Sequence, residues 1–274
     1  MLKAVIARLR QGHRTINYPS APPPALPDRF RGRPVLTAAK CRSGCHACAD
    51  ACPTGAITIE GAKPGEVSLG EGSHGKYRID LGKCLFCADC VAACPEGALV
   101  HAADYRLSSS SREDLDVELE RNGPLLASAL EKKMKCLFGR SLKLRQVSAG
   151  GCNACEADVN VLSTIGWDLG RFGIQMVASP RHADGILVTG PVTKNMELAL
   201  VKTWNAIAEP KLIIVVGSCA ISGGPFIGDE QVLGGLPPGM KPDLFVPGCP
   251  PHPLTILDGL LRLVGRIEGE GRGR

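Results

Sequence analysis

The run SLKLRQVSAGGCNACEADVNVLSTIG, residues 141–166, decides how the second half of the chain folds. It begins with an apolar, strand-like segment, continues through a glycine pair and the C-x2-C motif of Cys152 and Cys155, and ends in a helix-like segment. A strand, a glycine turn and a helix in this order are typical of an open α/β sheet. The C-x2-C motif alone is ambiguous, because redox dithiols, zinc sites and iron–sulfur sites all use it.

Residues 141–274 alternate apolar runs with helical patterns. Met196 and Trp204 lie on one stripe of the helix predicted within TKNMELALVKTWNAIAEP, and Pro253 opens a second helix in PLTILDGLLRLVG. We therefore expect a doubly wound, flavodoxin-like α/β domain with a mostly parallel sheet, in which the Met196 stripe is part of the core. Its strands are predicted at Leu142–Val147, Ile174–Val177, Ile186–Thr189, Leu212–Val216 and Leu244–Val246.

Two later cysteines lie in the same local setting as the C-x2-C pair. Cys219 and Cys249 each follow a predicted strand, and glycines flank both. Open α/β sheets assemble their sites at the carboxyl ends of the strands, so all four cysteines are expected to meet there. Four thiolates are what one [4Fe–4S] cluster requires, although a structural zinc ion could use the same four. The predicted ligands are Cys152, Cys155, Cys219 and Cys249.

A second cysteine pattern occupies residues 41–103, where CRSGCHACADACP and CLFCADCVAACP continue into the related turns PTGAI and PEGAL. The last three cysteines of the first run recur 42 residues later in the second run. The first run opens with C-x3-C at Cys41, whereas the second opens with C-x2-C at Cys84. In two-cluster ferredoxins the fourth cysteine of each run binds the other cluster. We expect an α+β domain with two [4Fe–4S] clusters, a zinc ribbon being the weaker alternative. The predicted sets are Cys41, Cys45, Cys48 with Cys94, and Cys84, Cys87, Cys90 with Cys52.

Composition limits the setting in which the chain works. Thirteen cysteines without a signal peptide favour metal binding over disulfides. No apolar stretch reaches the roughly 20 residues that a membrane-spanning helix needs. The sequence therefore predicts a soluble, cytosolic chain.

The first 40 residues form a basic leader, with eight basic side chains and one acidic side chain in a chain of net charge +5. LKAVIARL predicts a short helix with one apolar face, and YPSAPPPALPDRFRGRP predicts an extended proline-rich segment. Such a leader suits a membrane surface or a partner subunit, a frayed and solvated helix being the alternative. Without interleaved aromatic residues, the leader does not predict nucleic-acid binding.

Residues 104–140 are predicted to join the two domains through short helices. SSSSREDLDVELERNG, residues 108–123, predicts a serine-rich break followed by a solvated acidic helix. LLASALEKKM predicts a second short helix. Cys136 belongs to no motif, so we expect a packed thiol without a ligand role.

The leader and the cysteine runs together resemble a known family. RTINYPSAPPPALPDRFRGRPVL, residues 14–36, followed by the two runs, is similar to the ferredoxin-type subunit of respiratory complex I and of formate hydrogenlyase. The resemblance implies that residues 1–40 lie along the membrane arm of a multisubunit complex. It places the chain peripherally, on the cytoplasmic face of the inner membrane.

The second half carries a separate resemblance, over roughly residues 138–264. FGRSLKLR, GGCNACE, TGPVTKNM, VGSCAISGGPF and VPGCPPHP resemble the small subunit of energy-converting [NiFe] hydrogenases and its homologue in complex I. The complex I subunit has two adjacent cysteines at the first position. The C-x2-C spacing of Cys152 and Cys155 therefore resembles the hydrogenase subunits more closely. The chain therefore resembles a natural fusion of two subunits.

Together the resemblances imply an oxidoreductase subunit that carries electrons through three [4Fe–4S] clusters. The implied partners are a hydrogenase large subunit or its complex I D-type counterpart, membrane subunits, and a formate dehydrogenase or ferredoxin donor. The alternative is a complex I-like quinone oxidoreductase whose large subunit holds no nickel. We expect no complete active site on this chain and no catalytic residue of its own. Glu156 and His252, close to the last cysteines, are candidates for coupling proton uptake to reduction.

Overall fold

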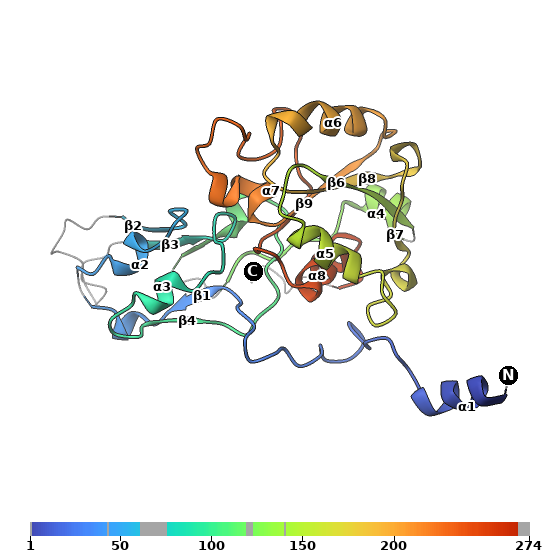
Figure 1. Cartoon of the computed structure of the whole chain (residues 1–274), viewed down its shortest axis with the longest axis horizontal. Helices are drawn as coiled ribbons and strands as arrows, with labels where there is room; N and C mark the ends of the chain where they lie inside the picture. The colour runs from blue at the N-terminus through green and yellow to red at the C-terminus, as the bar shows by residue number, and fades with distance from the viewer. Residues whose placement is uncertain (1, 43, 61–75, 119–122, 140, 268–274) are drawn as a thin grey trace.

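The computed structural model describes residues 2–42, 44–60, 76–118, 123–139 and 141–267. A ferredoxin-type domain and an α/β domain lie side by side, and the N-terminal helix projects away from both (Figure 1). Among the described helices, none has the length and apolar character to cross a bilayer.

The α/β domain is built on a five-stranded, wholly parallel sheet, which confirms the predicted fold class. The central strands consist almost entirely of branched aliphatic residues and are buried at every position, because helices cover both faces. All five predicted strands are present within one residue of the expected bounds. In sheet order they are β10 (Leu244–Val246), β9 (Leu212–Val216), β8 (Gly185–Thr189), β6 (Leu142–Ser148) and β7 (Ile174–Met176).

Successive residues of each strand enter two different apolar clusters, as the period of two in a strand requires. In β9, Ile213 and Val215 pack on the side of helix α6, whereas Ile214 and Val216 pack on the side of helix α8. Figure 1 shows α6 on one face of the sheet, with α5 and α8 on the other. The helices are α5 (Ala154–Val161), α6 (Lys194–Asn205), α7 (Ser218–Ser222) and α8 (Pro253–Leu263), with short 3-10 turns at Leu169–Phe172, Pro180–His182 and Gly224–Phe226.

The predicted core stripe of α6 is confirmed. Leu200 is fully buried, Ile207 is nearly so, and Met196 and Trp204 are partly buried against the same cluster. Pro253 begins α8 as predicted, in a helix that is buried along its whole length. These residues therefore pack in the core.

In its described residues, the ferredoxin-type domain contains two small antiparallel sheets and two one-turn helices, which agrees with the expected α+β class. A three-stranded sheet has the order β2-β3-β5, and β1 pairs with β4. The elements are β1 (Pro34–Leu36), the 3-10 turn Ala38–Lys40, α2 (Ala47–Asp50), β2 (Ile57–Glu60), β3 (Lys76–Asp80), α3 (Asp89–Ala92) and β4 (Leu99–His101).

The acidic helix predicted after the serine-rich segment is wrong. Residues Glu113–Leu115 form a 3-10 turn, and Asp116–Glu118 form strand β5, which pairs with β3. Leu115 and Val117 are buried while the acidic residues alternate outward, a period of two that indicates a strand. Asp116 lies within ion-pair distance of Arg78 on β3, at 3.8 Å. Residues 119–122 of this prediction lie outside the described residues.

The predicted break at the serine-rich segment is also wrong. Ser108 and Ser109 are fully buried, and the backbone of Ser109 exchanges two hydrogen bonds with Phe245 on β10. The hydroxyl of Ser108 donates to the carbonyl of Thr255 in α8. The second helix, predicted over residues 125–134, is misplaced: α4 (Lys132–Phe138) overlaps only the end of that range. The segment that was expected to be a linker is thus bonded to the α/β domain.

The leader divides into two parts. Helix α1 (Leu2–Gln11) forms as predicted, with every side chain exposed, so its docking on a membrane or partner stays a prediction. The following segment lies on the chain's own surface, where the amide of Ile16 donates to Gly166 O and Arg171 Nη2 donates to Tyr18 O. The proline-rich stretch is therefore anchored to the chain's own surface at Tyr18, Leu26 and Phe30, while residues 22–25 and 27–29 are exposed.

A buried polar triad holds this segment to α8. The hydroxyl of Tyr18 donates to Asp258 Oδ1 at 2.6 Å, and Arg262 Nε donates to Asp258 Oδ2 at 2.8 Å. Asp258 is 0% exposed and Arg262 is 3% exposed, so each depends on the other for compensation of its buried charge.

Tyr18→Phe should lower the free energy of unfolding by about 1.5–3 kcal/mol, because it removes a hydrogen bond to a buried carboxylate. Asp258→Ala should cost about 3–5 kcal/mol, since it leaves the Arg262 charge buried and unpaired. Chemical denaturation of the full chain measures both. Thr203→Val, which removes an exposed hydroxyl from α6, is the control. Equal stabilities of Tyr18→Phe and the control would contradict the role of the triad.

Candidate metal centres

The two cysteine runs of the ferredoxin-type domain fold into the same turn twice. In the first, the amide of Gly55 donates to the carbonyl of Cys52 and the amide of Ala56 donates to its Sγ, both at 3.2 Å. The second turn has the same two bonds at Cys94, with the same distances. Gly55 and Gly97 have φ of +59° and +57°, a conformation that favours glycine. The duplication read from the sequence is therefore present in the backbone.

The second thiol set, defined as Cys52, Cys84, Cys87 and Cys90, lines one cavity together with His101. Burial raises the pKa of Cys84 to about 12; a backbone amide opposes the shift, and the other three thiols add to it. The structure thus brings together the four cysteines of the crossed pairing.

The first thiol set, defined as Cys41, Cys45, Cys48 and Cys94, shows the complementary grouping. Burial raises the pKa of Cys41, and the thiols of Cys45 and Cys94 contribute to the shift. Burial also raises the pKa of Cys48 to about 11, with Cys41 as the largest charged contribution. The additional residue between Cys41 and Cys45 therefore leaves Cys41 beside its predicted neighbours.

The third thiol set, defined as Cys152, Cys155, Cys219 and Cys249, forms at the carboxyl edge of the parallel sheet. A Cβ atom at Gly217, which has φ +92°, would lie 2.5 Å from Cys155 Sγ. Only glycine leaves room for that sulfur. The loop that follows β6 can thus lie directly against the loop that carries Cys219.

Electrostatic coupling links all four members of the third set. Burial raises the pKa of Cys155, and the largest charged contribution comes from Cys219. Burial raises the pKa of Cys219 to about 11, with contributions from Cys249 and Cys152. Cys152 and Cys249 are exposed while the other two are partly buried. The set therefore faces solvent on one side, where a partner could cover it.

Glu156 lies next to this set, nearly buried behind Cys155. Thr189 Oγ1 donates to its Oε1 at 2.7 Å, and the hydroxyl of Ser148 donates to it as well. Burial opposes ionisation, but these hydrogen bonds outweigh it and lower the pKa of Glu156. The side chain is thus a fixed carboxylate at neutral pH, and its role in proton coupling stays a prediction.

His252 precedes α8 and caps it. Its Nδ1 accepts a hydrogen bond from the amide of Leu254 at 3.1 Å, and its ring meets Phe30 and Trp167 edge-on. Burial lowers the pKa of His252, which favours the neutral ring. This geometry gives His252 a structural role, and proton coupling through it also stays a prediction.

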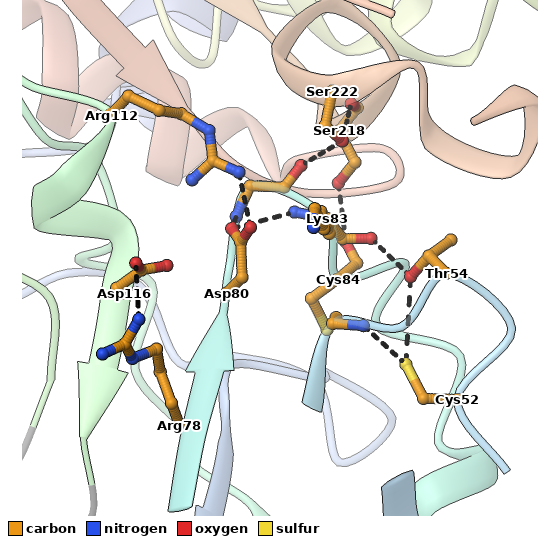
Figure 2. Close-up of polar contacts among 12 residues, drawn as sticks. Cys52, Thr54, Arg78, Asp80, Lys83, Cys84, Arg112, Asp116, Ser218 and Ser222 are labelled. Carbon is orange, nitrogen blue, oxygen red and sulfur yellow. Dashed lines mark hydrogen bonds and ion pairs between the residues drawn. The ribbon is translucent and has the colours of Figure 1, made fainter. Parts of the chain in front are cut away.

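A carboxylate that the sequence reasoning missed organises the turn before Cys84. Asp80 Oδ1 accepts hydrogen bonds from the amides of Gly82 and Lys83, at 2.9 and 3.2 Å. Arg112 Nη2 lies 2.5 Å from Asp80 Oδ2 (Figure 2). An aspartate two residues before a glycine is the signal of an Asx turn, and it could have identified this residue.

Cys136 belongs to none of the three sets, as predicted, but the expectation of a packed thiol is wrong. It is exposed on α4, whereas Phe138 is buried and Met134 is partly buried. Positions two residues apart in a helix point in different directions, so packing of these two side chains leaves Cys136 in solvent.

The polar atoms around the first two thiol sets suit iron–sulfur clusters. Three buried atoms near the first two sets have no hydrogen-bond partner among the described residues: Tyr77 Oη, His46 Nε2 and His101 Nε2. Tyr77 is electrostatically coupled to thiols of both sets, with Cys48 and Cys90 first among them. A buried hydroxyl without a partner suits cluster sulfides, which accept hydrogen bonds.

Within the described ranges, no three His, Cys, Asp or Glu side chains are placed to hold one metal ion. A four-iron cluster poses a different requirement, because its four thiolates are spread over a group of four irons. Each set supplies four sulfurs, the ligand type and number that such a cluster takes.

Comparison with protein families finds two matches along the chain. Residues 152–263 match the NADH ubiquinone oxidoreductase, 20 Kd subunit. Residues 40–98 match the 4Fe-4S dicluster domain. The two matched ranges contain all twelve cysteines of the three thiol sets.

Three relatives illustrate the similarity. Formate hydrogenlyase subunit 7 of Escherichia coli is 38% identical over 52% of this chain, which spans 54% of that protein. The probable membrane-bound hydrogenase subunit mbhJ of Pyrococcus furiosus is 40% identical, over 52% of this chain and 89% of the relative. A subunit of the NADH-quinone oxidoreductase of Carboxydothermus hydrogenoformans is 40% identical, over 43% of this chain and 72% of the relative.

Among solved structures, the membrane-bound sulfane sulfur reductase, an archaeal respiratory membrane complex, matches with 28% identity. The match covers 51% of this chain and 80% of the other, and its TM-score of 0.42 is too low to bear on fold or function. The relatives at 40% identity, most of whose length is matched, establish the relationship. The chain belongs to the family of the 20 Kd subunit of NADH ubiquinone oxidoreductase.

Proposed function

We propose that this chain is the electron-transfer subunit of a membrane-associated, energy-converting hydrogenase complex similar to formate hydrogenlyase. Each thiol set would hold one [4Fe–4S] cluster, giving three in all. The observation that carries the proposal is the grouping of twelve cysteines into three sets of four, two in the range of the dicluster domain and one at the sheet edge.

When bound, such a cluster supplies reversible transfer of one electron. The chain's own residues hold it and adjust its surroundings. Amides of Ala56, Phe86 and Ala98 donate to cysteine sulfurs at 3.2–3.4 Å, which stabilises thiolates. At Cys94, burial opposes ionisation, but hydrogen bonds from backbone amides outweigh it and lower the pKa. Around the second set, buried apolar side chains such as Phe86 limit the access of water.

The names of the relatives indicate which partner subunits this chain would contact. Two are named as subunits of formate hydrogenlyase and of a membrane-bound hydrogenase, and others as subunits of NADH-quinone oxidoreductases. The C-x2-C spacing of Cys152 and Cys155 favours the hydrogenase assignment. The exposed side of the third set would then face a large subunit that holds nickel. The complex I-like alternative has the same arrangement, but its large subunit holds no nickel and reduces quinone.

The remaining assembly follows from the same proposal. The chain would be a natural fusion of a ferredoxin-type subunit and a hydrogenase small subunit, peripheral to the cytoplasmic face of the membrane. Exposed apolar residues and basic residues of α1 would contact membrane subunits. A formate dehydrogenase or a ferredoxin would supply or receive electrons. The catalytic chemistry would belong to the large subunit.

Anaerobically reconstituted full-length chain should contain about twelve irons and about twelve acid-labile sulfides, the content of three four-iron clusters. Metal analysis and sulfide determination measure both, and zinc should be absent. A colourless preparation with zinc in place of iron would contradict the proposal. About eight irons would leave one set without its cluster.

Cys152→Ser should remove one of three reduced-cluster signals in electron paramagnetic resonance, because only the third set loses a thiolate. The two signals of the ferredoxin-type domain should persist. Cys136→Ser is the matched control, since this exposed thiol belongs to no set, and it should retain all three signals. Simultaneous loss of every signal in Cys152→Ser would contradict independent sites.

The complex isolated through a tag on this chain should contain nickel, which separates the hydrogenase from its alternative. Elemental analysis should find nickel in proportion to the large subunit, together with hydrogen-dependent reduction of a dye. Quinone reduction by a nickel-free complex would support the complex I-like alternative instead.

A further inference from the structure

One buried serine connects the ligand loops of two thiol sets. Ser218 immediately precedes Cys219 and is only 1% exposed. Its hydroxyl donates to the carbonyl oxygen of Cys84, in the second set, at 2.6 Å (Figure 2). The hydroxyl also lies 3.2 Å from the carbonyl of Gly248, which precedes Cys249. A hydroxyl carries one proton, and the shorter distance assigns it to Cys84.

The backbone of Ser218 is fixed as firmly as its side chain. Its amide donates to the carbonyl of Gly248 at 2.8 Å, and the amide of the preceding Gly217 donates to Val246 O at 2.8 Å. The loops that carry Cys219 and Cys249 are thus bonded to each other at the point where Ser218 reaches the other domain.

The turn that receives this hydrogen bond is itself held in place. Asp80 binds its amides, and Ser222 Oγ donates to the carbonyl of Gly82 at 2.9 Å. A Cβ atom at Gly82 would lie 2.8 Å from Ile221 Cγ2, so the turn packs directly on α7. Neither loop can shift without breaking buried contacts.

We propose that Ser218 is a positioning residue that fixes the separation and orientation of the second and third thiol sets, and thereby the rate of electron exchange between them. This inference rests on the proposed function, since it matters only if both sets hold clusters. One electron passes, so the site that loses it is oxidised as the other is reduced, and no bond is made or broken. Electron tunnelling falls exponentially with distance, so a small displacement has a large effect on its rate.

The test uses the full, reconstituted chain carrying Ser218→Ala. Iron and sulfide content should equal that of the unmodified chain, because no ligand is lost. The magnetic interaction between the reduced second and third clusters, measured by electron paramagnetic resonance, should weaken. Electron redistribution between them, followed by rapid freeze-quench, should slow several-fold. A merely structural role for Ser218 would lower thermal stability without changing either property.

Ser109→Ala is the matched control, because it removes an equally buried serine hydroxyl, which donates to the carbonyl of Leu125 and not to a residue of either thiol set. It should leave the magnetic interaction unchanged. Ser218→Thr, which keeps the hydroxyl, should retain the interaction of the unmodified chain.

Three outcomes would overturn the inference. The first is an unchanged magnetic interaction in a fully loaded Ser218→Ala chain, and the second is an equal change in Ser109→Ala. The third is loss of iron in Ser218→Ala together with normal loading in Ser218→Thr, which would make Ser218 a folding residue. Failure of the unmodified chain to hold clusters would instead refute the proposed function, and this inference with it.

Discussion

The arrangement of the α/β domain depends on one constraint: parallel strands all end at the same edge of their sheet. Three loops leave that edge from β6, β9 and β10, and each carries at least one cysteine of the third set. The strand between them, β8, contributes Thr189, whose hydroxyl bonds Glu156 beside the set. The strands are buried on both faces, so packing in the core fixes where each loop begins. The positions of these loops therefore do not depend on a bound group.

The two domains share a hydrophobic core, and this explains how their thiol sets keep a defined relationship. Leu81 and Leu115 of the ferredoxin-type domain belong to the same cluster as Ile221 of α7 and Ile213 of β9. The segment between the domains adds hydrogen bonds to β10 and α8. Packing of this kind fixes the position of one domain relative to the other, as a large apolar interface between domains does.

The sequence predicted the regular parts of this molecule well, because those parts follow from local patterns. Apolar runs identified every strand of the parallel sheet. The crossover of the fourth cysteines expected of two-cluster ferredoxins predicted that Cys52 lies with Cys84, Cys87 and Cys90, and these four line one cavity. Strand β5 was not predicted because the charges of DLDVE indicated a solvated helix more strongly than the alternation of its polar and apolar residues indicated a strand. The pairing of β5 with β3 and the ion pair of Asp116 with Arg78 are tertiary contacts. Asp80 and Ser218 were missed because their importance comes from contacts with segments distant in the sequence. No local pattern encodes those contacts, so they became visible only in the folded chain.

The anchoring of Tyr18 also limits where helix α1 can be. The chain is bonded to the body of the protein from Ile16 onward, so the five residue steps back to Gln11 set the length of a tether. At 3.3–3.6 Å per residue, that tether spans about 18 Å at most. The helix can therefore explore only a small volume around one fixed origin on the α8 side of the molecule. Any surface that α1 binds must therefore come within about one tether length plus one helix length of this origin, so the face of the molecule that carries α8 is the one closest to it.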